Sequence, residues 1–268
     1  MTAPFGQRLA DAVAARGPLC VGIDPHAPLL AAWGLPDSPD GLARFTDAVV
    51  DALAGSVAVL KPQAAFYERH GSRGLAVLED GVARARAAGA LVLLDAKRGD
   101  IGSTMEAYAG YLAPGHPLAV DAMTVSPYLG PESLQPAVDT AREHGAGLFV
   151  LARTSNPDAG TLQLVGEPSV AQRVVDTVRG WNAGTATGSF GVVVGATLRE
   201  LDVDLEGLGG PVLAPGLGAQ GGAPEDLRRL FGTGTVVVPT VSRDVLSAGP
   251  DVAALRAAAD RWAAALAA

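Results

Sequence analysis

Lysine is almost absent from this chain. Its 268 residues include only Lys61 and Lys97, beside eighteen arginines. Each lysine ends an apolar run, SVAVLK or ALVLLDAK, where a strand is expected to end. Arginine stays protonated at ordinary pH, whereas lysine can shift its pKa and exchange a proton. Lysine kept at two strand ends, among carboxylates, indicates that both take part in chemistry. The alternative is that they only pair with nearby acids.

Residues for disulfides and metal sites are also scarce. The single cysteine, Cys20, excludes an internal disulfide, and in the run LCVGID it is expected to pack as a small apolar side chain. The four histidines show no paired spacing, and the chain has no HExxH motif, cysteine cluster, P-loop or nucleophile elbow. These histidines are His26, His70, His116 and His144. We therefore expect no metal site.

Charge and hydropathy exclude further classes of protein. The net charge is −8 and no segment concentrates arginine, which argues against a nucleic-acid-binding surface. No apolar run reaches the roughly 18 residues of a membrane span, and the N-terminal segment lacks the apolar core of a signal peptide. We expect a cytoplasmic protein without nucleic-acid or membrane partners. With 49% apolar residues, it can bury a sizeable core.

Short apolar runs, by contrast, are frequent and alternate with helical patterns. They are continuous rather than alternating, which is typical of parallel strands covered on both faces. The runs span 18–24, 57–62, 91–97, 118–125, 147–153, 191–197, 211–216 and 235–241. Eight strand–helix units predict a (β/α)₈ TIM barrel, with residues 1–268 as one domain including N-terminal and C-terminal helices. A doubly wound open sheet is the alternative, but the first turn, GIDPHAP, lacks GxGxxG.

The connections give two more detailed predictions. The segment 198–210, LRELDVDLEGLGG, is short and resembles an abbreviated helix. Gly55, Gly89 and Gly145 follow helical patterns and are expected to be left-handed C-caps.

In such a barrel the active site lies at the carboxyl ends of the strands. The polar residues there are, in order, Asp24, Lys61, Asp95, Lys97, Ser126, Ser155, Asn156, Thr197, Gln220, Ser242 and Arg243. Capping of the following helices would also place Asp, Ser and Thr at these positions. It would not explain the two lysines or Arg243.

Four charges are expected to meet at this end. Asp95 and Lys97 are two residues apart on one strand and so share a face, Asp100 follows in the loop, and Lys61 ends the adjacent strand. Unit charges about 4 Å apart interact by roughly 4 kcal/mol at an effective dielectric near 20, so all four should stay ionised. A fixed negative charge beside a proton donor suits loss of CO₂ and protonation of the resulting carbanion. A rim salt-bridge network is the alternative.

The last two strand ends predict a phosphate site. The loop PGLGAQGG offers backbone N–H groups and the Gln220 amide, and Arg243 can bind phosphate with two hydrogen bonds. A flexible loop is the alternative interpretation of the glycines.

The segment LLDAKRGDIGST resembles the signature of the orotidine 5′-monophosphate decarboxylases. KPQAAFYE, TVSPYLG, ARTSNP, GVVVGAT, APGLGAQGG and VSRDVL resemble the longer bacterial subgroup of that family, so the likeness runs from residue 22 to residue 244. The resemblance implies conversion of orotidine 5′-monophosphate to uridine 5′-monophosphate and CO₂ in pyrimidine biosynthesis, with no cofactor and no metal. The segment 156–168 is an insertion relative to the shorter subgroup.

The resemblance also implies residue roles. Lys61, Asp95, Lys97 and Asp100 would form the charged network, in which Lys97 protonates C6 and Asp95 lies beside the departing carboxylate. Asp24 and Lys61 would hold ribose hydroxyls, Ser155 would contact the pyrimidine, and Gln220 and Arg243 would hold the phosphate beneath a closing loop. Asp100, Ile101 and Thr104 would reach into the partner's site, which implies a homodimer with shared active sites.

Three other functions remain open at this point. A related sugar-phosphate decarboxylase or aldolase would use Mg²⁺ and an acid at the end of the second strand, where this chain has Lys61. A Schiff-base aldolase would use a lysine as nucleophile. A non-catalytic nucleotide-binding protein would need only the phosphate site.

Overall fold

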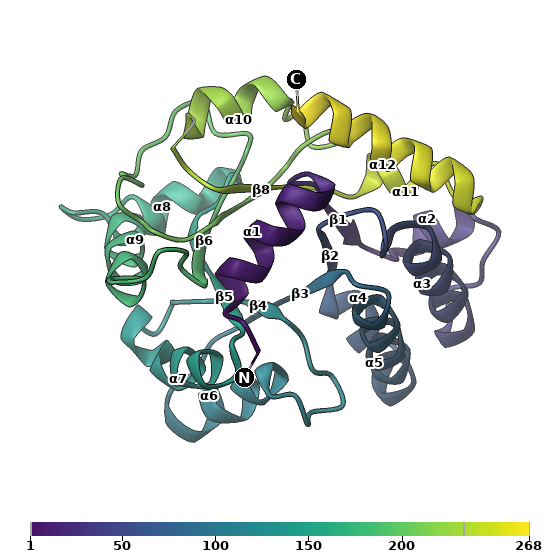
Figure 1. Cartoon of the computed structure of the whole chain (residues 1–268), viewed down its shortest axis with the longest axis horizontal. Helices are drawn as coiled ribbons and strands as arrows, with labels where there is room; N and C mark the ends of the chain where they lie inside the picture. Colours follow the sequence, from purple (N-terminus) through teal and green to yellow (C-terminus); the bar gives the residue numbers. More distant parts are fainter. Residues whose placement is uncertain (1, 233, 268) are drawn as a thin grey trace.

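In the computed structural model, which describes residues 2–232 and 234–267, eight parallel strands close into a barrel (Figure 1). The strands are β1 Cys20–Ile23, β2 Val59–Pro62, β3 Leu91–Arg98, β4 Ala122–Val125, β5 Gly147–Arg153, β6 Phe190–Val194, β7 Val212–Pro215 and β8 Val237–Val241. Each strand pairs with the next one along the chain, and β8 pairs with β1. The predicted (β/α)₈ barrel is confirmed, and the open doubly wound sheet was the wrong alternative.

Each of the eight predicted apolar runs overlaps one strand. Almost every strand residue is buried, because helices cover the outside of the barrel and side chains fill its inside. The largest boundary difference is at β4, which begins at Ala122 rather than at 118. The assignment of residues 1–268 to one domain stays a prediction, which the closed ring of strands supports.

Helices surround the strands (Figure 1). They are α1 Phe5–Arg16, α2 Ala27–Ala32, α3 Pro39–Leu53, α4 Ala64–Glu68, α5 Gly71–Ala87, α6 Gly102–Ala109, α7 Gln135–His144, α8 Gly160–Gln163, α9 Val170–Trp181, α10 Pro224–Phe231, α11 Arg243–Leu246 and α12 Val252–Ala267, with short 3₁₀ turns at Gly110–Leu112, Pro131–Leu134 and Pro157–Ala159. Local chemistry explains where some begin. Ser38 caps α3 by accepting the N–H of Gly41, and Ser169 caps α9 by accepting the N–H of Gln172. No helix in the described ranges is long and apolar enough to cross a membrane.

The abbreviated helix predicted at 198–210 was wrong, because that segment consists of turns and bends. Gly207 and Gly209 have positive φ angles of 67° and 68°. Arg153 of β5 pairs with Asp202, which ties this segment to the barrel.

The predicted left-handed glycines are confirmed at two positions. Gly145 caps α7 with a φ of 65°, and Gly89, which directly follows the C-cap Ala88 of α5, has a φ of 94°. Gly55 does not have a positive φ, so that prediction was wrong.

The amino end of the barrel is closed by α1, which lies across the ring of strands (Figure 1). Phe5 and Leu9 of α1 are buried in the amino-end core of the barrel together with Cys20, Leu93 and Phe149. The rings of Phe5 and Phe149 meet edge to face, with centroids 5.9 Å apart. Burial raises the pKa of the Cys20 thiol to about 12, consistent with a packing role.

An ion-pair group, which we call the amino-end cluster, fixes α1 in place. It consists of Arg8 from α1, Arg86 from α5 and Asp121, which precedes β4. Asp121 is 4% exposed; its Oδ1 lies 2.6 Å from Arg8 Nη1, and its Oδ2 lies 3.3 Å from Arg86 Nε. The N–H of Val92 also donates to Asp121 Oδ2 at 2.9 Å. These contacts hold α1 against the amino end of the barrel.

Candidate active site

A cavity of about 280 Å³ opens at the carboxyl ends of the strands, and we call it the mouth cavity. Its wall contains residues predicted for the site: Asp24, Lys61, Asp95, Lys97, Gln220, Ser242 and Arg243. The rest of the wall is Gln63, Thr124, Leu151, Val193, Leu213, Thr240 and the residues 215–217 and 219 of the glycine-rich loop. The wall thus combines charged groups with apolar side chains, as in many small-molecule sites.

Asp95 is the centre of the charged end of this cavity. Its Oδ2 accepts hydrogen bonds from Lys61 Nζ at 2.9 Å and from Gln63 Nε2 at 3.3 Å. Its Oδ1 accepts hydrogen bonds from Lys97 Nζ at 2.6 Å and from Thr124 Oγ1 at 2.9 Å. We call Lys61, Asp95 and Lys97 the mouth cluster.

The burial of Lys61 and Asp95 makes their charges mutually dependent. They are 5% and 7% exposed. Burial alone would raise the pKa of Asp95, but Lys61 and Lys97 outweigh it and hold that pKa well below its usual range. Burial alone would lower the pKa of Lys61, but Asp95 and Asp24 outweigh it and hold that pKa above its usual range. Both groups are therefore charged across the ordinary pH range.

Lys97 reaches Asp95 from a strained backbone. Its φ is 49°, and it is the one residue other than glycine with a positive φ in the part of the chain that the structure describes. The pairing of β3 with β4 is regular up to Leu94 and irregular from there to Arg98. Such a conformation costs about 1–3 kcal/mol and is typical of functional positions. The predicted approach of Lys97 to Asp95 is thus present, but an irregular strand produces it rather than simple alternation.

The structure does not bring Asp100 into the cluster of its own chain. Asp100 lies beyond β3, its Oδ1 accepts the N–H of Ile101 at 2.8 Å, and it does not line the mouth cavity. Ile101 is 63% exposed, and Thr104 is exposed on α6. Within one chain, the predicted group of four charges therefore has three members.

The glycine-rich loop after β7 is a hydrogen-bonded turn. The N–H of Gly218 donates to Gly222 O at 2.8 Å, and the N–H of Gly222 donates to Gly216 O at 3.0 Å. A Cβ on Gly218 would lie 2.3 Å from Asp244 Oδ2, so only glycine fits there. Arg243 Nη2 lies 3.5 Å from Ala219 O, which places the guanidinium beside the loop. The glycine-rich loop and Arg243, both predicted to bind phosphate, therefore lie next to each other.

Three polar atoms of the mouth are buried without a hydrogen-bond partner among the described residues. They are Asp24 Oδ1, Thr240 Oγ1 and Ser242 Oγ. Buried polar atoms are normally satisfied, so unpartnered ones that line a cavity indicate where a polar ligand binds.

Other predicted residues lie outside the cavity wall. Ser155 packs over Gly195, where an added Cβ would lie 3.0 Å from Ser155 Oγ. Ser126, Asn156 and Thr197 are not among the residues that line the cavity. The role of Ser155 stays a prediction.

Sequence reasoning missed Gln63 and Thr124, which both donate to Asp95. Gln63 directly follows Lys61 and Pro62, so its position after β2 could have indicated it. Thr124 lies inside β4, two residues before the predicted polar strand end Ser126. It was missed because a β-branched residue within an apolar run is usually interpreted as part of the hydrophobic core.

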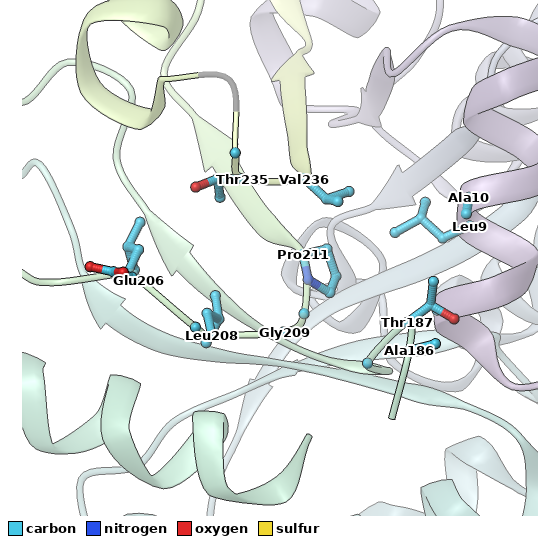
Figure 2. Close-up of a pocket in the computed structure, with 16 residues that line it drawn as sticks. Leu9, Ala10, Ala186, Thr187, Glu206, Leu208, Gly209, Pro211, Thr235 and Val236 are labelled. Atoms are coloured by element: carbon cyan, nitrogen blue, oxygen red, sulfur yellow. The ribbon is translucent and has the colours of Figure 1, made fainter. Parts of the chain in front are cut away.

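A larger cavity of about 430 Å³ lies at the amino end (Figure 2). Figure 2 shows Leu9 and Ala10 of α1 on one side of it and Leu208, Gly209 and Pro211 on another. Glycines and small or apolar residues dominate its wall, and Glu206 is its one ionisable residue. It offers no cation for a phosphate and no group placed for proton transfer, so the mouth cavity is the better candidate.

No group of three or more His, Cys, Asp or Glu side chains that could hold a metal ion occurs within residues 2–232 and 234–267. The metal-free reaction nevertheless stays a prediction.

Comparison with known sequences agrees with the motifs. The chain matches the Orotidine 5′-phosphate decarboxylase / HUMPS family over residues 17–258. It is 60% identical over 263 residues to an orotidine 5′-phosphate decarboxylase of Salinispora arenicola, covering 96% of this chain and 95% of that protein. It is 62% identical over 266 residues to the Streptomyces coelicolor enzyme of the same name, covering 97% and 96%.

Solved structures agree as well. A crystal structure from Streptomyces avermitilis, assigned as an orotidine 5′-phosphate decarboxylase, superposes with a TM-score of 0.95 at 60% identity, covering 100% of this chain and 97% of that one. OMP decarboxylase of Leishmania donovani superposes with a TM-score of 0.75 at 32% identity, covering 98% of each chain. These matches confirm the resemblance found in the motifs: the chain belongs to the orotidine 5′-phosphate decarboxylase / HUMPS family.

Proposed function

We propose that the mouth cavity is where this chain converts orotidine 5′-monophosphate to uridine 5′-monophosphate and CO₂, the reaction of pyrimidine biosynthesis. The reaction follows from the family and from relatives about 60% identical over almost the whole chain. The assignment of steps to side chains rests on one observation above all. A buried carboxylate, Asp95, is held between two lysine ammonium groups at the wall of an open cavity.

The proposed chemistry gives each of the three charged groups of the mouth cluster a role. The substrate carboxylate on C6 lies beside Asp95, the C6–CO₂ bond breaks, and its electron pair stays on C6. The ammonium groups of Lys61 and Lys97 stabilise that carbanion, because they are fixed in place before it forms. Lys97 Nζ then gives a proton to C6, which completes uridine 5′-monophosphate. The Lys97 side chain is 45% exposed, so its amine can recover a proton from water.

Asp95 can act in two ways in this scheme. Its negative charge can destabilise the bound carboxylate, or it can hold the two lysines in the positions where they stabilise the carbanion. The four hydrogen bonds that Asp95 accepts fix its orientation in either case.

The remaining site residues bind the rest of the nucleotide in this proposal. Asp24 and Lys61 hold ribose hydroxyls, and the unpartnered Asp24 Oδ1 supports that role. Gln220, Arg243 and the glycine-rich loop hold the phosphate and close over it. Ser155 contacts the pyrimidine.

The alternative functions fit the geometry less well. An Mg²⁺-dependent relative needs an acid at the end of β2, where Lys61 lies paired with Asp95. A Schiff base needs a neutral lysine amine, whereas the pKa of Lys61 is held above its usual range. A mere binding protein would have no need of a buried charge cluster beyond the phosphate loop.

An absorbance assay tests the function directly. Purified protein mixed with orotidine 5′-monophosphate in excess EDTA should lower the absorbance of the substrate as uridine 5′-monophosphate forms. Activity that EDTA removes and Mg²⁺ restores would favour the metal-dependent relative. Trapping of the protein by borohydride with a carbonyl substrate would favour the Schiff-base mechanism.

We further propose a homodimer in which Asp100, Ile101 and Thr104 complete the partner's site. Asp100 lies outside its own mouth cluster, and Ile101 is exposed on the same loop. Tyr128 and Leu129, in the loop after β4, are also 75% and 53% exposed. The loops after β3 and β4 touch, since a Cβ on Gly99 would lie 2.2 Å from Ser126 O. Together these two loops present exposed apolar side chains beside the Asp100 carboxylate, a surface that a second chain could cover.

Mixing two inactive variants tests the shared site. Lys97→Ala and Asp100→Ala homodimers should each be nearly inactive. After free exchange in an equal mixture, half of the dimers are mixed and one of their two sites is intact, so about a quarter of wild-type activity should return. Mixed dimers without regained activity would show that Asp100 serves its own chain. Cytoplasmic location and the absence of a cofactor, nucleic-acid partner or membrane partner stay predictions from composition and resemblance.

A further inference from the structure

Thr124 is a polar residue in an otherwise apolar strand. It lies in β4 between Met123 and Val125 and is 1% exposed. A buried hydroxyl is unfavourable unless both its donor and its acceptor capacity are used. Here both are used, and both partners belong to the mouth cluster.

The two hydrogen bonds of Thr124 have a fixed direction. The N–H of Lys97 can only donate, and it lies 3.0 Å from Thr124 Oγ1. The single hydroxyl proton is therefore free to point at Asp95 Oδ1, which lies 2.9 Å away and, as an ionised carboxylate, can only accept. Because one partner only donates and the other only accepts, the hydroxyl cannot reverse its orientation.

The same hydroxyl makes its contact where the regular backbone pairing of β3 with β4 is interrupted. The regular pairing of β3 with β4 stops after Leu94, and Lys97 has a φ of 49°. The contact from Lys97 N–H to Thr124 replaces a missing backbone ladder bond at this point. It holds the backbone from which the Lys97 ammonium extends to the Oδ1 atom that Thr124 also contacts.

We propose that Thr124 is a positioning residue for the decarboxylation. Its hydroxyl sets the direction of the Asp95 carboxylate and the strained backbone of Lys97 together, and so fixes the ammonium relative to C6 of the substrate. This inference rests on the proposed function. A small misplacement of a catalytic group can cost a large factor in rate, so the expected effect is on kcat rather than on nucleotide binding.

Three substitutions separate the hydroxyl from the shape of the side chain. Thr124→Val keeps the branched shape and removes both hydrogen bonds. Thr124→Ser keeps the hydroxyl and removes a methyl group, and Thr124→Ala removes both. Thr46→Val is the matched control, because Thr46 is equally buried and its hydroxyl is 2.8 Å from Tyr67 Oη, away from the mouth cavity.

The measurements are kcat and KM for orotidine 5′-monophosphate, the dissociation constant of uridine 5′-monophosphate, and Tm. We expect Thr124→Val to lower kcat about ten- to hundredfold, the worth of one hydrogen bond to a charged group. Product binding should change less than about threefold. Thr124→Ser should retain kcat within about fivefold, and Thr46→Val should lower Tm with kcat within about twofold.

Equal kcat for Thr124→Val and wild type would overturn the inference, as would equal losses in Thr124→Ser and Thr124→Val. If Thr124→Val does not fold, the Ser and Ala variants decide, since both lack the methyl group and only Ser keeps the hydroxyl. Equal kcat in those two variants would overturn the inference. Wild-type protein that fails to turn over the substrate would instead reject the proposed function.

Discussion

Two buried aspartates of this chain each lie between two cationic side chains, at opposite ends of the same barrel. Asp121 lies between Arg8 and Arg86 at the amino end, and Asp95 lies between Lys61 and Lys97 at the carboxyl end. In each cluster the closest contact between nitrogen and oxygen is 2.6 Å. Charge arrangement alone therefore does not distinguish a structural cluster from a reactive one.

The cations differ in chemistry. Arginine keeps its proton at any ordinary pH, so the amino-end cluster can bind and orient but cannot transfer a proton. Lysine carries a compact charge and can give up a proton. The chain places its only two lysines in the mouth cluster.

The remaining partners differ as well. Asp121 accepts the backbone N–H of Val92, and Arg8 donates to Gly145 O, so the amino-end cluster joins α1 to the barrel. The mouth cluster borders a cavity, next to polar atoms such as Asp24 Oδ1 that lack a partner among the described residues. The amino-end cluster is closed by its own chain, whereas we propose that a ligand completes the mouth cluster.

The largest expected effect comes from removing one cation from each cluster. Lys97→Ala should lower kcat by more than about a thousandfold, because a positioned acid contributes about 10²–10⁴ and electrostatic stabilisation adds to it. Arg86→Ala is the matched change at Asp121 and should leave kcat within about threefold. Steady-state kinetics on both variants check this, with circular dichroism as the control for folding. A Lys97→Ala enzyme that retains more than a thousandth of wild-type turnover would argue against proton donation.

Neutralising the two aspartates should affect different properties: kcat for Asp95 and stability for Asp121. Asp95→Asn should lower kcat about a hundredfold or more, because the lysines lose their fixed counter-charge. Asp121→Asn should leave kcat nearly unchanged and lower the free energy of unfolding by about 2 kcal/mol, the worth of a charged hydrogen bond. Urea denaturation and kinetics on the same preparations provide the comparison. If Asp95→Asn and Asp121→Asn lowered kcat and the free energy of unfolding by the same amounts, the two clusters would have the same role.

The smallest expected effect is on stability as a function of pH. The pKa of Asp95 is held below its ordinary 3.8, so its contribution is complete above that value and is lost as the pH falls toward the folded-state pKa. The pKa of Lys61 is held above its ordinary 10.5, so its contribution is complete below that value and is lost at higher pH.

The difference in unfolding free energy between wild type and Asp95→Asn should therefore stay constant from about pH 5 to pH 9 and shrink below about pH 4. Urea titrations at a series of pH values measure this difference. If it declined between pH 5 and pH 7 instead, the ion pair would be weaker than its geometry indicates.

The architecture could be predicted because its signals are local. Continuous apolar runs and helical patterns each occupy adjacent residues, and each of the eight predicted runs overlaps one strand. Lys61 and Lys97 could be predicted because lysine is so rare here. The connection 198–210 could not, because side-chain contacts such as Arg153–Asp202 decide its path and are not visible in sequence.

The remaining features depend on contacts between residues that are far apart in the sequence. Arg8 and Asp121 are 113 positions apart, so nothing local indicates the amino-end cluster. Thr124 lies 29 positions from Asp95 and resembles a core residue of its strand. The irregular end of β3 could not be predicted either, since regular alternation already places Asp95 and Lys97 on one face.

Exchanging the two cations tests the central claim most directly, that the mouth lysine transfers a proton while the amino-end arginine only pairs. Lys97→Arg keeps the positive charge near Asp95 and removes the ability to give a proton, and Arg86→Lys makes the reverse change near Asp121. The measurement is kcat for orotidine 5′-monophosphate in both variants. We predict a loss of more than about a thousandfold for Lys97→Arg and less than about threefold for Arg86→Lys. A Lys97→Arg enzyme with a tenth or more of wild-type kcat would contradict proton transfer by Lys97.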